Sequence, residues 1–165
     1  MEIKGDGFIL RKPKLIDAEA IYKLQQDQKV KKGFMSVPKS VVEVKKEIRK
    51  GDKNGEGFVI DINGEVGGEI SFHFWEPPKK FKAILSLWVA KKYRRKGIAT
   101  NAIKLITKYA FKKYPIVRMQ GNIRTFNKAS AKACEKAGYK LEGVLRKNKM
   151  KGNKYYDDYV YAKVK

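Results

Sequence analysis

The 165-residue chain carries 39 Lys and Arg against 17 Asp and Glu, a net charge of +22, while 42% of its residues are hydrophobic and 12% aromatic. This composition excludes a disordered polycation and is sufficient for one domain with a single core, spanning residues 1–165. The single cysteine, Cys134, excludes an internal disulfide, and with one histidine, His73, no metal site is expected. The sequence has neither a secretory signal nor an apolar run of about 20 residues, so we expect a soluble cytoplasmic protein.

The positive charge is concentrated in the second half of the chain. Residues 1–80 contain 16 Lys and Arg and 13 Asp and Glu, whereas residues 81–165 contain 23 and only four. This asymmetry suggests a polyanionic partner for the second half, such as RNA or the ribosome. A Lys-rich composition without such a partner would account equally well for the total charge, but less well for its uneven distribution.

The first half predicts a strand, two helices and a β-hairpin. Pro13 ends the strand, Asp17 can cap the first helix and Ser40 opens the second. Asn63-Gly64 is a typical hairpin turn between two strand-like runs. The predicted elements are, in order, a strand at 8–13, helices at 18–27 and 40–50, a polar loop at 51–57 and a hairpin within 57–75.

The second half adds a strand, two helices and three further strands. The run "AILSLWVA" is apolar almost throughout, as in a strand buried on both faces, and Pro77-Pro78 place a turn before it. Lys104, Lys108 and Lys112 lie four residues apart on the polar side of the next helix. The predicted elements are a strand at 81–90, a helix at 97–113, a strand at 116–123, a helix between Asn127 and Gly138, and a hairpin of strands at 139–146 and 154–164. The order predicts an α/β sandwich around a mixed sheet.

The stretch "RRKGIAT" joins the buried strand to the N-terminus of the long helix. The first turn of a helix leaves several amide N–H groups unpaired and is the positive end of the helix dipole. Gly97 lets a phosphate approach the backbone, Ala99 is nearly as small, and Thr100 can add a hydroxyl. The cations that can neutralise an anion here are Arg94, Arg95 and Lys96. This stretch therefore predicts a pyrophosphate site.

The same stretch matches the pattern [RQ]-x-x-G-x-[GA], the acetyl-coenzyme A loop of the GCN5-related N-acetyltransferases (GNAT). It fits neither G-x-G-x-x-G nor the Walker pattern. The segments "LWVAKKYRRKGIATNAIKLITKYAF", "NKASAKACEKAGYKLEGVLRK" and "KYYDDYVYAKV" resemble the branch of that family that contains the ribosomal-protein N-terminal acetyltransferases. "FILRKPKLIDAEAIYKL" resembles the opening strand and helix of that branch, so the resemblance spans nearly the whole chain.

The resemblance implies a GNAT fold, in which a mixed, mostly antiparallel sheet splays between its fourth and fifth strands and is flanked by about four helices. Acetyl-CoA would lie in the splay, with its pantetheine arm paired to backbone near Trp88 and Val89. Asn127, in the family's N-x-x-S, would contact that arm, with Ser130 nearby. An acceptor amine would attack the thioester directly, without an acyl-enzyme. The pyrophosphate would lie on the amides of Arg95, Lys96, Gly97, Ile98, Ala99 and Thr100.

The residues that many family members use for catalysis are replaced in this chain. Aligned on Trp88, the position of the usual glutamate base holds Ile84. The position of the usual proton-donating tyrosine holds Cys134, which is either a weak acid or a small buried residue. The alternative bases are Glu69 and His73, which lie four residues apart on the neighbouring strand and therefore share one face. Bulk water is a further alternative.

The acceptor side is less sharply defined by the sequence. Ser86 stands where the family pattern has glycine, and we take it as a substrate-binding residue of the central strand. Tyr155, Tyr156 and either Asp157 or Asp158 of "YYDDY" are further candidates, although alternate residues of a strand face opposite sides.

The charge distribution favours a protein N-terminus, presented beside RNA or within an acidic peptide, over a polycationic polyamine as the acceptor. Other small amines stay open. Two non-enzymatic alternatives are a nucleic-acid-binding module, for which no signature is present, and a protein that binds coenzyme A as a sensor. The replacements at Ile84 and Cys134 are compatible with the sensor alternative, because the usual catalytic residues are missing. The resemblance also implies that a homodimer is a common arrangement.

Overall fold

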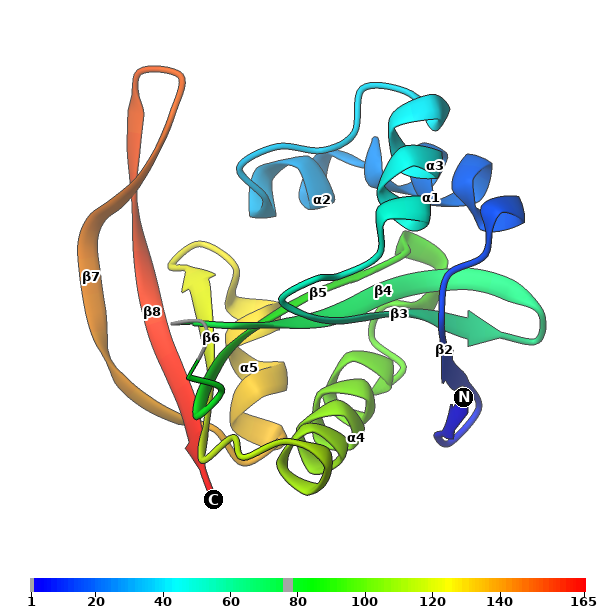
Figure 1. Ribbon diagram of the computed structural model, residues 1–165. Coiled ribbons are helices and arrows are strands. Elements are labelled where there is room, and N and C mark those ends of the chain that lie inside the picture. Colours follow the sequence, from blue (N-terminus) through cyan, green and yellow to red (C-terminus); the bar gives the residue numbers. More distant parts are fainter. Residues whose placement is uncertain (1, 76–78) are drawn as a thin grey trace.

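One sheet runs through the molecule, with helices on both of its faces (Figure 1). The structure is a computed structural model that describes residues 2–75 and 79–165, so the turn predicted at Pro77-Pro78 lies outside the described residues. The strands are β1 (Glu2–Lys4), β2 (Ile9–Arg11), β3 (Gly55–Ile62), β4 (Glu65–Phe74), β5 (Lys82–Val89), β6 (Arg118–Arg124), β7 (Lys140–Lys151) and β8 (Lys154–Val164).

The strands are ordered β1-β2-β3-β4-β5-β6-β8-β7. Every neighbouring pair is antiparallel except β5 and β6, which are parallel. The predicted mixed and mostly antiparallel sheet is therefore confirmed. The hairpin turn predicted at Asn63-Gly64 joins β3 to β4, and both of its residues have positive φ, which glycine and asparagine tolerate best.

The helices divide between the two faces of the sheet: α1, α2 and α3 cover one face, and α4 and α5 cover the other (Figure 1). Side-chain caps fix several of their N-termini: Ser40 accepts a hydrogen bond from the amide of Glu43 and opens α3, as predicted. The helices are α1 (Ala18–Gln25), α2 (Gln28–Gly33), α3 (Val41–Lys50), α4 (Ile98–Lys113) and α5 (Lys128–Lys136), with 3-10 turns η1 (Leu15–Asp17) and η2 (Lys91–Tyr93).

Three features differ from the sequence-based expectation. α2 was not predicted, because its six residues bury only Val30 and so show no helical periodicity. β1 has three residues, too few for a strand pattern. β7 continues to Lys151, beyond the predicted end at residue 146, because two register shifts against β8 let the strand pass through Lys147 at φ 49°.

The core consists of two layers of apolar side chains, one on each face of the sheet. α4 and α5 pack against the larger layer, which includes Phe72 and Ile106, and α1 and α3 pack against the smaller one around Val59 and Trp88. Every residue of β5 is buried or half-buried, which confirms that this strand is covered on both faces.

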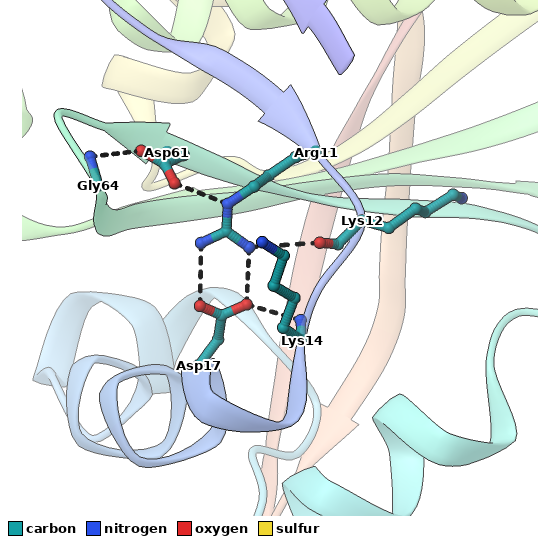
Figure 2. Close-up of polar contacts among 6 residues, drawn as sticks. All are labelled: Arg11, Lys12, Lys14, Asp17, Asp61 and Gly64. Atoms are coloured by element: carbon teal, nitrogen blue, oxygen red, sulfur yellow. Dashed lines mark hydrogen bonds and ion pairs between the residues drawn. The ribbon is translucent and has the colours of Figure 1, made fainter. Parts of the chain in front are cut away.

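A buried arginine fastens three parts of the first half together (Figure 2). Arg11 Nε donates to Asp61 at 2.6 Å, and its two terminal nitrogens donate to the carboxylate of Asp17 at 2.8 and 2.9 Å. Asp61 also accepts from the amide of Gly64 at 2.7 Å. Burial alone would raise the pKa of Asp17, but the hydrogen bonds from Arg11 hold it below its ordinary value. Asp17 therefore binds Arg11 of β2 and the amide of Lys14. It does not cap α1, contrary to our expectation.

The Arg11 network predicts a large loss of stability when its cation is removed. We expect Arg11→Ala to lower the free energy of unfolding by about 3–5 kcal/mol, because two buried carboxylates lose their counter-charge. Exposed Arg49 on α3 is the matched control, and Arg49→Ala is expected to change the free energy of unfolding by less than about 0.5 kcal/mol. Urea denaturation at pH 7 measures both. Equal, small effects would show that the network contributes no net stability.

Candidate active site

β5 and β6 pair over three residues only and then diverge. The paired residues end at Ile84 opposite Gln120, although both strands continue. Beyond that point β5 keeps its partner β4 and β6 keeps its partner β8. The predicted splay of the sheet is therefore confirmed.

A cavity of about 620 Å³ lies in this gap. It is walled by residues 84–87 of β5 and 120–124 of β6, and by residues 33–35 after α2. The amide of Ala90 donates to the carbonyl of Gly67 on β4. Because backbone groups alternate in direction along an antiparallel pair, those of Ser86 and Trp88 also point toward β4. The backbone groups of Leu85, Leu87 and Val89 point the other way, toward the gap. The strand thus directs the backbone groups of Leu87 and the amide of Val89 toward the gap, and not those of Trp88; the carbonyl of Val89 accepts a hydrogen bond from Arg94.

The basic loop follows β5 and leads into α4. Gly97 is the N-cap, with φ +77°, and the amide of Asn101 is the first to bond within the helix, to the carbonyl of Gly97. The amides of residues 98–100 consequently have no partner inside the helix. A Cβ at Gly97 would meet nothing closer than the side-chain nitrogen Nδ2 of Asn101, at 4.0 Å. The backbone here is therefore open to a ligand.

The cations of the loop divide into two groups. Arg94 donates to Asp27 at 2.7 Å and to the carbonyl of Val89 at 2.9 Å, and this pairing lowers the pKa of Asp27. Arg94 therefore anchors the loop and does not stand free to neutralise an anion, contrary to our expectation. Arg95 and Lys96 form no ion pair with any described residue and remain as the cations of the anion site.

Three predicted residues of α5 line the same cavity. Asn127 and Ser130 do so at the start of the helix, where the Asn127 side chain accepts the Ser130 amide at 3.2 Å. Cys134 is 4% exposed, and burial raises the pKa of its thiol to about 12. A thiol with so high a pKa yields its proton reluctantly, which favours the packing role of Cys134 over the role of an acid.

A second cavity, of about 370 Å³, lies on the opposite side of β5, beneath α1 and α3. The two cavities share Phe34, Ser86 and Leu87 among their lining residues. Ser86, predicted to face the substrate, therefore lies where they meet.

Glu69 is the central polar group of the second cavity. Its Oε2 accepts hydrogen bonds from the indole of Trp88 and from the side-chain amide of Gln25, both at 2.8 Å. Burial raises the pKa of Glu69 to about 7, the two hydrogen bonds oppose this effect, and the charges of Glu47 and Asp52 add to it. Glu69 is therefore a carboxyl group that changes its protonation state near neutral pH.

Further carboxylates surround the mouth of this cavity, although the protein as a whole is strongly basic. Glu43 and Glu47 on α3, together with Asp52, line it beside Glu69. No described Lys or Arg forms an ion pair with any of the four, and burial and the neighbouring acids raise the pKa of Glu47. The only lysine in the lining is Lys39.

The lining offers acceptors in excess of donors. The amide oxygen of Gln25 is buried and has no hydrogen-bond partner among the described residues. No group of three His, Cys, Asp or Glu in the described chain is arranged to hold a metal ion, so the carboxylates are spread along the wall. Sequence reasoning missed this wall, although the four-residue spacing of Glu43 and Glu47 places both on one side of α3.

The other predicted residues lie outside both cavities. His73 is exposed on β4, and Tyr155, Tyr156 and Asp157 lie on β8 away from either lining. Asp158, the alternative to Asp157, is fully buried and paired with Arg124.

Arg124 is a cavity residue that the sequence analysis did not find. It is 7% exposed, lines the first cavity and directs one guanidinium nitrogen to the sulfur of Met35 at 3.3 Å. Its ion pair with Asp158 holds β6 against β8 where the gap is widest, which positions this wall of the cavity.

A splayed α/β sheet, with a basic glycine-containing turn between its central strand β5 and the N-terminus of α4, defines the class of this protein. A family model described as an acetyltransferase (GNAT) domain matches residues 8–140. The chain belongs to the GNAT acetyltransferase family. No helix of the described residues is long and apolar enough to cross a membrane.

Individual relatives agree with this assignment. YnaD of Bacillus subtilis, described as an uncharacterised N-acetyltransferase, is 28% identical over 169 residues, which cover 98% of this chain and 96% of YnaD. The structure of the microcin C7 self-immunity acetyltransferase MccE with acetyl-CoA and AMP superposes with a TM-score of 0.84 at 25% identity, covering 96% of this chain and 93% of MccE. The ribosomal L7/L12 α-N-protein acetyltransferase RimL, in complex with coenzyme A, has the same fold, with a TM-score of 0.88 at 19% identity over 99% and 98% of the two chains.

The open backbone at Gly97 predicts that a side chain there blocks the anion site. We expect Gly97→Glu to weaken acetyl-CoA binding at least about 100-fold, because the added carboxylate occupies and repels the position of a phosphate. Gly7 is the matched control, since it has φ +74° and equally open surroundings in the β1–β2 turn, so Gly7→Glu carries the same backbone strain and charge. Calorimetric titration with acetyl-CoA measures both. Similar affinities for the two variants would contradict the assignment of this loop.

Proposed function

We propose that this protein transfers an acetyl group from acetyl-CoA to a primary amine, and that the amine is the N-terminus of a protein. The observation that carries the proposal is the junction at Ser86, where the cavity between β5 and β6 meets a second cavity that contains Glu69. The family supports acetyl transfer, and the likeness in fold to RimL is consistent with a protein acceptor.

The residues of the first cavity suit acetyl-CoA. The amides of residues 98–100, with Arg95 and Lys96, would hold its pyrophosphate. The backbone groups of Leu87 and the amide of Val89 would pair with its pantetheine arm, and Asn127 and Ser130 line the same cavity. When bound, acetyl-CoA supplies an acyl group activated as a thioester.

Glu69 acts as the proton acceptor for the attacking amine in this proposal. An amine must lose a proton to form the amide product, and a base with a pKa near the working pH takes it most effectively. Glu69 has such a pKa and lies in the cavity that adjoins the gap, whereas exposed His73 lies outside it. Trp88 and Gln25 hold the carboxyl group in place through Oε2.

The pKa of Glu69 also distinguishes between classes of amine. An α-amino group has a pKa of about 7.7–8.0, within about one unit of Glu69, whereas an alkyl ammonium such as that of lysine has a pKa of about 10.4. Deprotonation of the alkyl ammonium by Glu69 is therefore disfavoured by more than about three pKa units, or roughly 4 kcal/mol. This difference supports an α-amine as the acceptor.

A small amine with two or more positive charges is the second candidate acceptor. We had considered a basic protein poorly suited to a polyamine, but the acids of its first half gather at the acceptor cavity. Glu43, Glu47 and Asp52 are carboxylates without ion pairs, and they favour the approach of a cation. This electrostatic feature supports the second candidate and is also compatible with the protonated N-terminus of a peptide.

The proposed base predicts a pH-dependent activity. We expect kcat/KM of the wild type to rise with pH and level off above about 7, as the Glu69 carboxylate forms. Glu69→Gln should lower kcat by about 100-fold or more and abolish this rise. Exposed Glu19 on α1 is the control, and Glu19→Gln should retain wild-type rates.

Measurements of the free energy of unfolding test whether misfolding explains the loss of activity in Glu69→Gln. Because the pKa of Glu69 is raised in the folded state from 4.5 to about 7, the folded protein binds this proton more tightly than the unfolded chain. The stability that this protonated carboxyl group contributes is fully present below about pH 4.5 and is lost as the pH rises through about 7. Glu69→Gln is therefore expected to be no less stable than the wild type at pH 8. An unchanged pH profile in this variant would remove Glu69 as the base.

A panel of acceptors tests the substrate. We expect coenzyme A thiol to be released with peptides that have a free N-terminus and not with the same peptides after N-acetylation, because the α-amine is the nucleophile. The second arm compares 1,4-diaminobutane with n-butylamine. Faster turnover of the diamine than of any peptide would favour the second candidate, and no thiol release with any amine would contradict acetyl transfer itself.

A further inference from the structure

The helices on the face opposite the acceptor cavity carry two rows of exposed lysines. Lys104, Lys108 and Lys112 lie four residues apart on α4, and Lys132 and Lys136 have the same spacing on α5. A spacing of four residues corresponds to a rise of about 6 Å along a helix. The two helices cover the same face of the sheet and contact each other (Figure 1), and their five exposed lysines are here termed the lysine face.

Few acidic side chains accompany the lysine face. α4 contains no Asp or Glu, and the single acid of α5 is Glu135, which accepts a hydrogen bond from the neutral Tyr161 at 2.7 Å and keeps its negative charge. Two of the other three acids of residues 81–165 form ion pairs elsewhere: Glu142 pairs with Arg118 and Asp158 with Arg124, while Asp157 accepts the amide of Lys147. The five lysines of the face, with one acid on their two helices, therefore keep a large excess of positive charge.

We propose that the lysine face docks on the phosphate backbone of an RNA duplex. Rows of lysines at regular spacing match a regularly charged backbone, and contacts of this kind supply sequence-independent affinity. The choice of RNA rests on the proposed function, because protein N-termini of the kind that RimL acetylates belong to ribosomal proteins and are presented beside RNA.

The composition of the lysine face argues against two other partners. A helix that lies on a membrane inserts large apolar side chains, and none of the exposed large hydrophobic residues of the described chain belongs to α4 or α5. Protein interfaces are enriched in aromatic residues and arginine and depleted in lysine, which is the reverse of this surface. A nucleic-acid backbone is the polyanion that remains.

The position of the lysine face has a functional consequence. α4 and α5 lie on one side of the sheet, whereas the cavity containing Glu69 lies beneath α1 and α3 on the other side (Figure 1). RNA bound to the lysine face would therefore leave the acceptor cavity accessible, so that the protein is held near its acceptor without obstruction of the site.

Fluorescence anisotropy with a labelled RNA duplex of about 20 base pairs, between about 50 and 200 mM KCl, tests the proposal. The triple variant Lys104→Gln, Lys108→Gln, Lys112→Gln should bind at least tenfold more weakly, and its slope of log affinity against log salt should fall in magnitude by about 2–3. The control removes three cations from the solvent side of α3, on the opposite face, by Lys46→Gln, Arg49→Gln and Lys50→Gln. It should change the affinity less than twofold.

Three outcomes would overturn the proposal: equal weakening by the control variant, salt-independent or absent RNA binding, and tighter binding to phosphatidylserine vesicles, poly-glutamate or a DNA duplex than to RNA. Acetylation of a free peptide is measured in parallel and should be unchanged in the triple variant. Loss of RNA binding with intact acetylation thus concerns the lysine face alone, while absence of acetylation in the wild type concerns the proposed function.

Discussion

The early end of the pairing between β5 and β6 is the constraint on which the rest of the site depends. Each strand keeps a partner on its other side, so the sheet stays intact while two edges face each other without hydrogen bonds. Unpaired backbone groups in a protein interior are costly unless water or a ligand satisfies them. Arg94 satisfies the carbonyl of Val89, and the neighbouring groups are left to a ligand in the gap. The cavity, the exposed backbone and the adjoining helix N-terminus all follow from this divergence.

Charge is sorted between the two faces of the same sheet. The acceptor face carries carboxylates, among them Glu69, whose ionised form opposes folding above about pH 7 because it is buried. The opposite face carries five exposed lysines, and the two helices that bear them contain a single acid, Glu135. A net charge of +22 therefore describes neither face, and the total charge does not reveal the carboxylates that line the cavity around Glu69. A destabilising carboxyl group next to the cofactor gap is the type of local cost that enzymes retain at functional positions.

The sequence was most informative where one physical pattern covers many residues. The long helix, the hairpin at Asn63-Gly64, the buried β5 and the glycine at the α4 N-cap were predictable, because each rests on periodicity or on a backbone requirement. Side-chain partners across the fold were not predictable. Arg94 is a residue type that often binds anions. In the fold, however, it lies beside Asp27, 67 residues earlier, and pairs with that carboxylate. The wall of acids around Glu69 likewise arises only when α3 folds over β4.

α2 shows how an element without a sequence signal connects the parts of the site. Its N-terminus is capped by Asp27, which also binds Arg94 of the cofactor loop, and its C-terminal carbonyls accept hydrogen bonds from Lys151 of the β7–β8 hairpin. Val30 lines the acceptor cavity, and Phe34, directly after the helix, lines both cavities. A shift of α2 therefore cannot occur without disturbing either the cofactor loop or the hairpin. Six residues with little stability of their own are held at both ends, and through them the loop before α4 and the walls of the two cavities keep a fixed relative position.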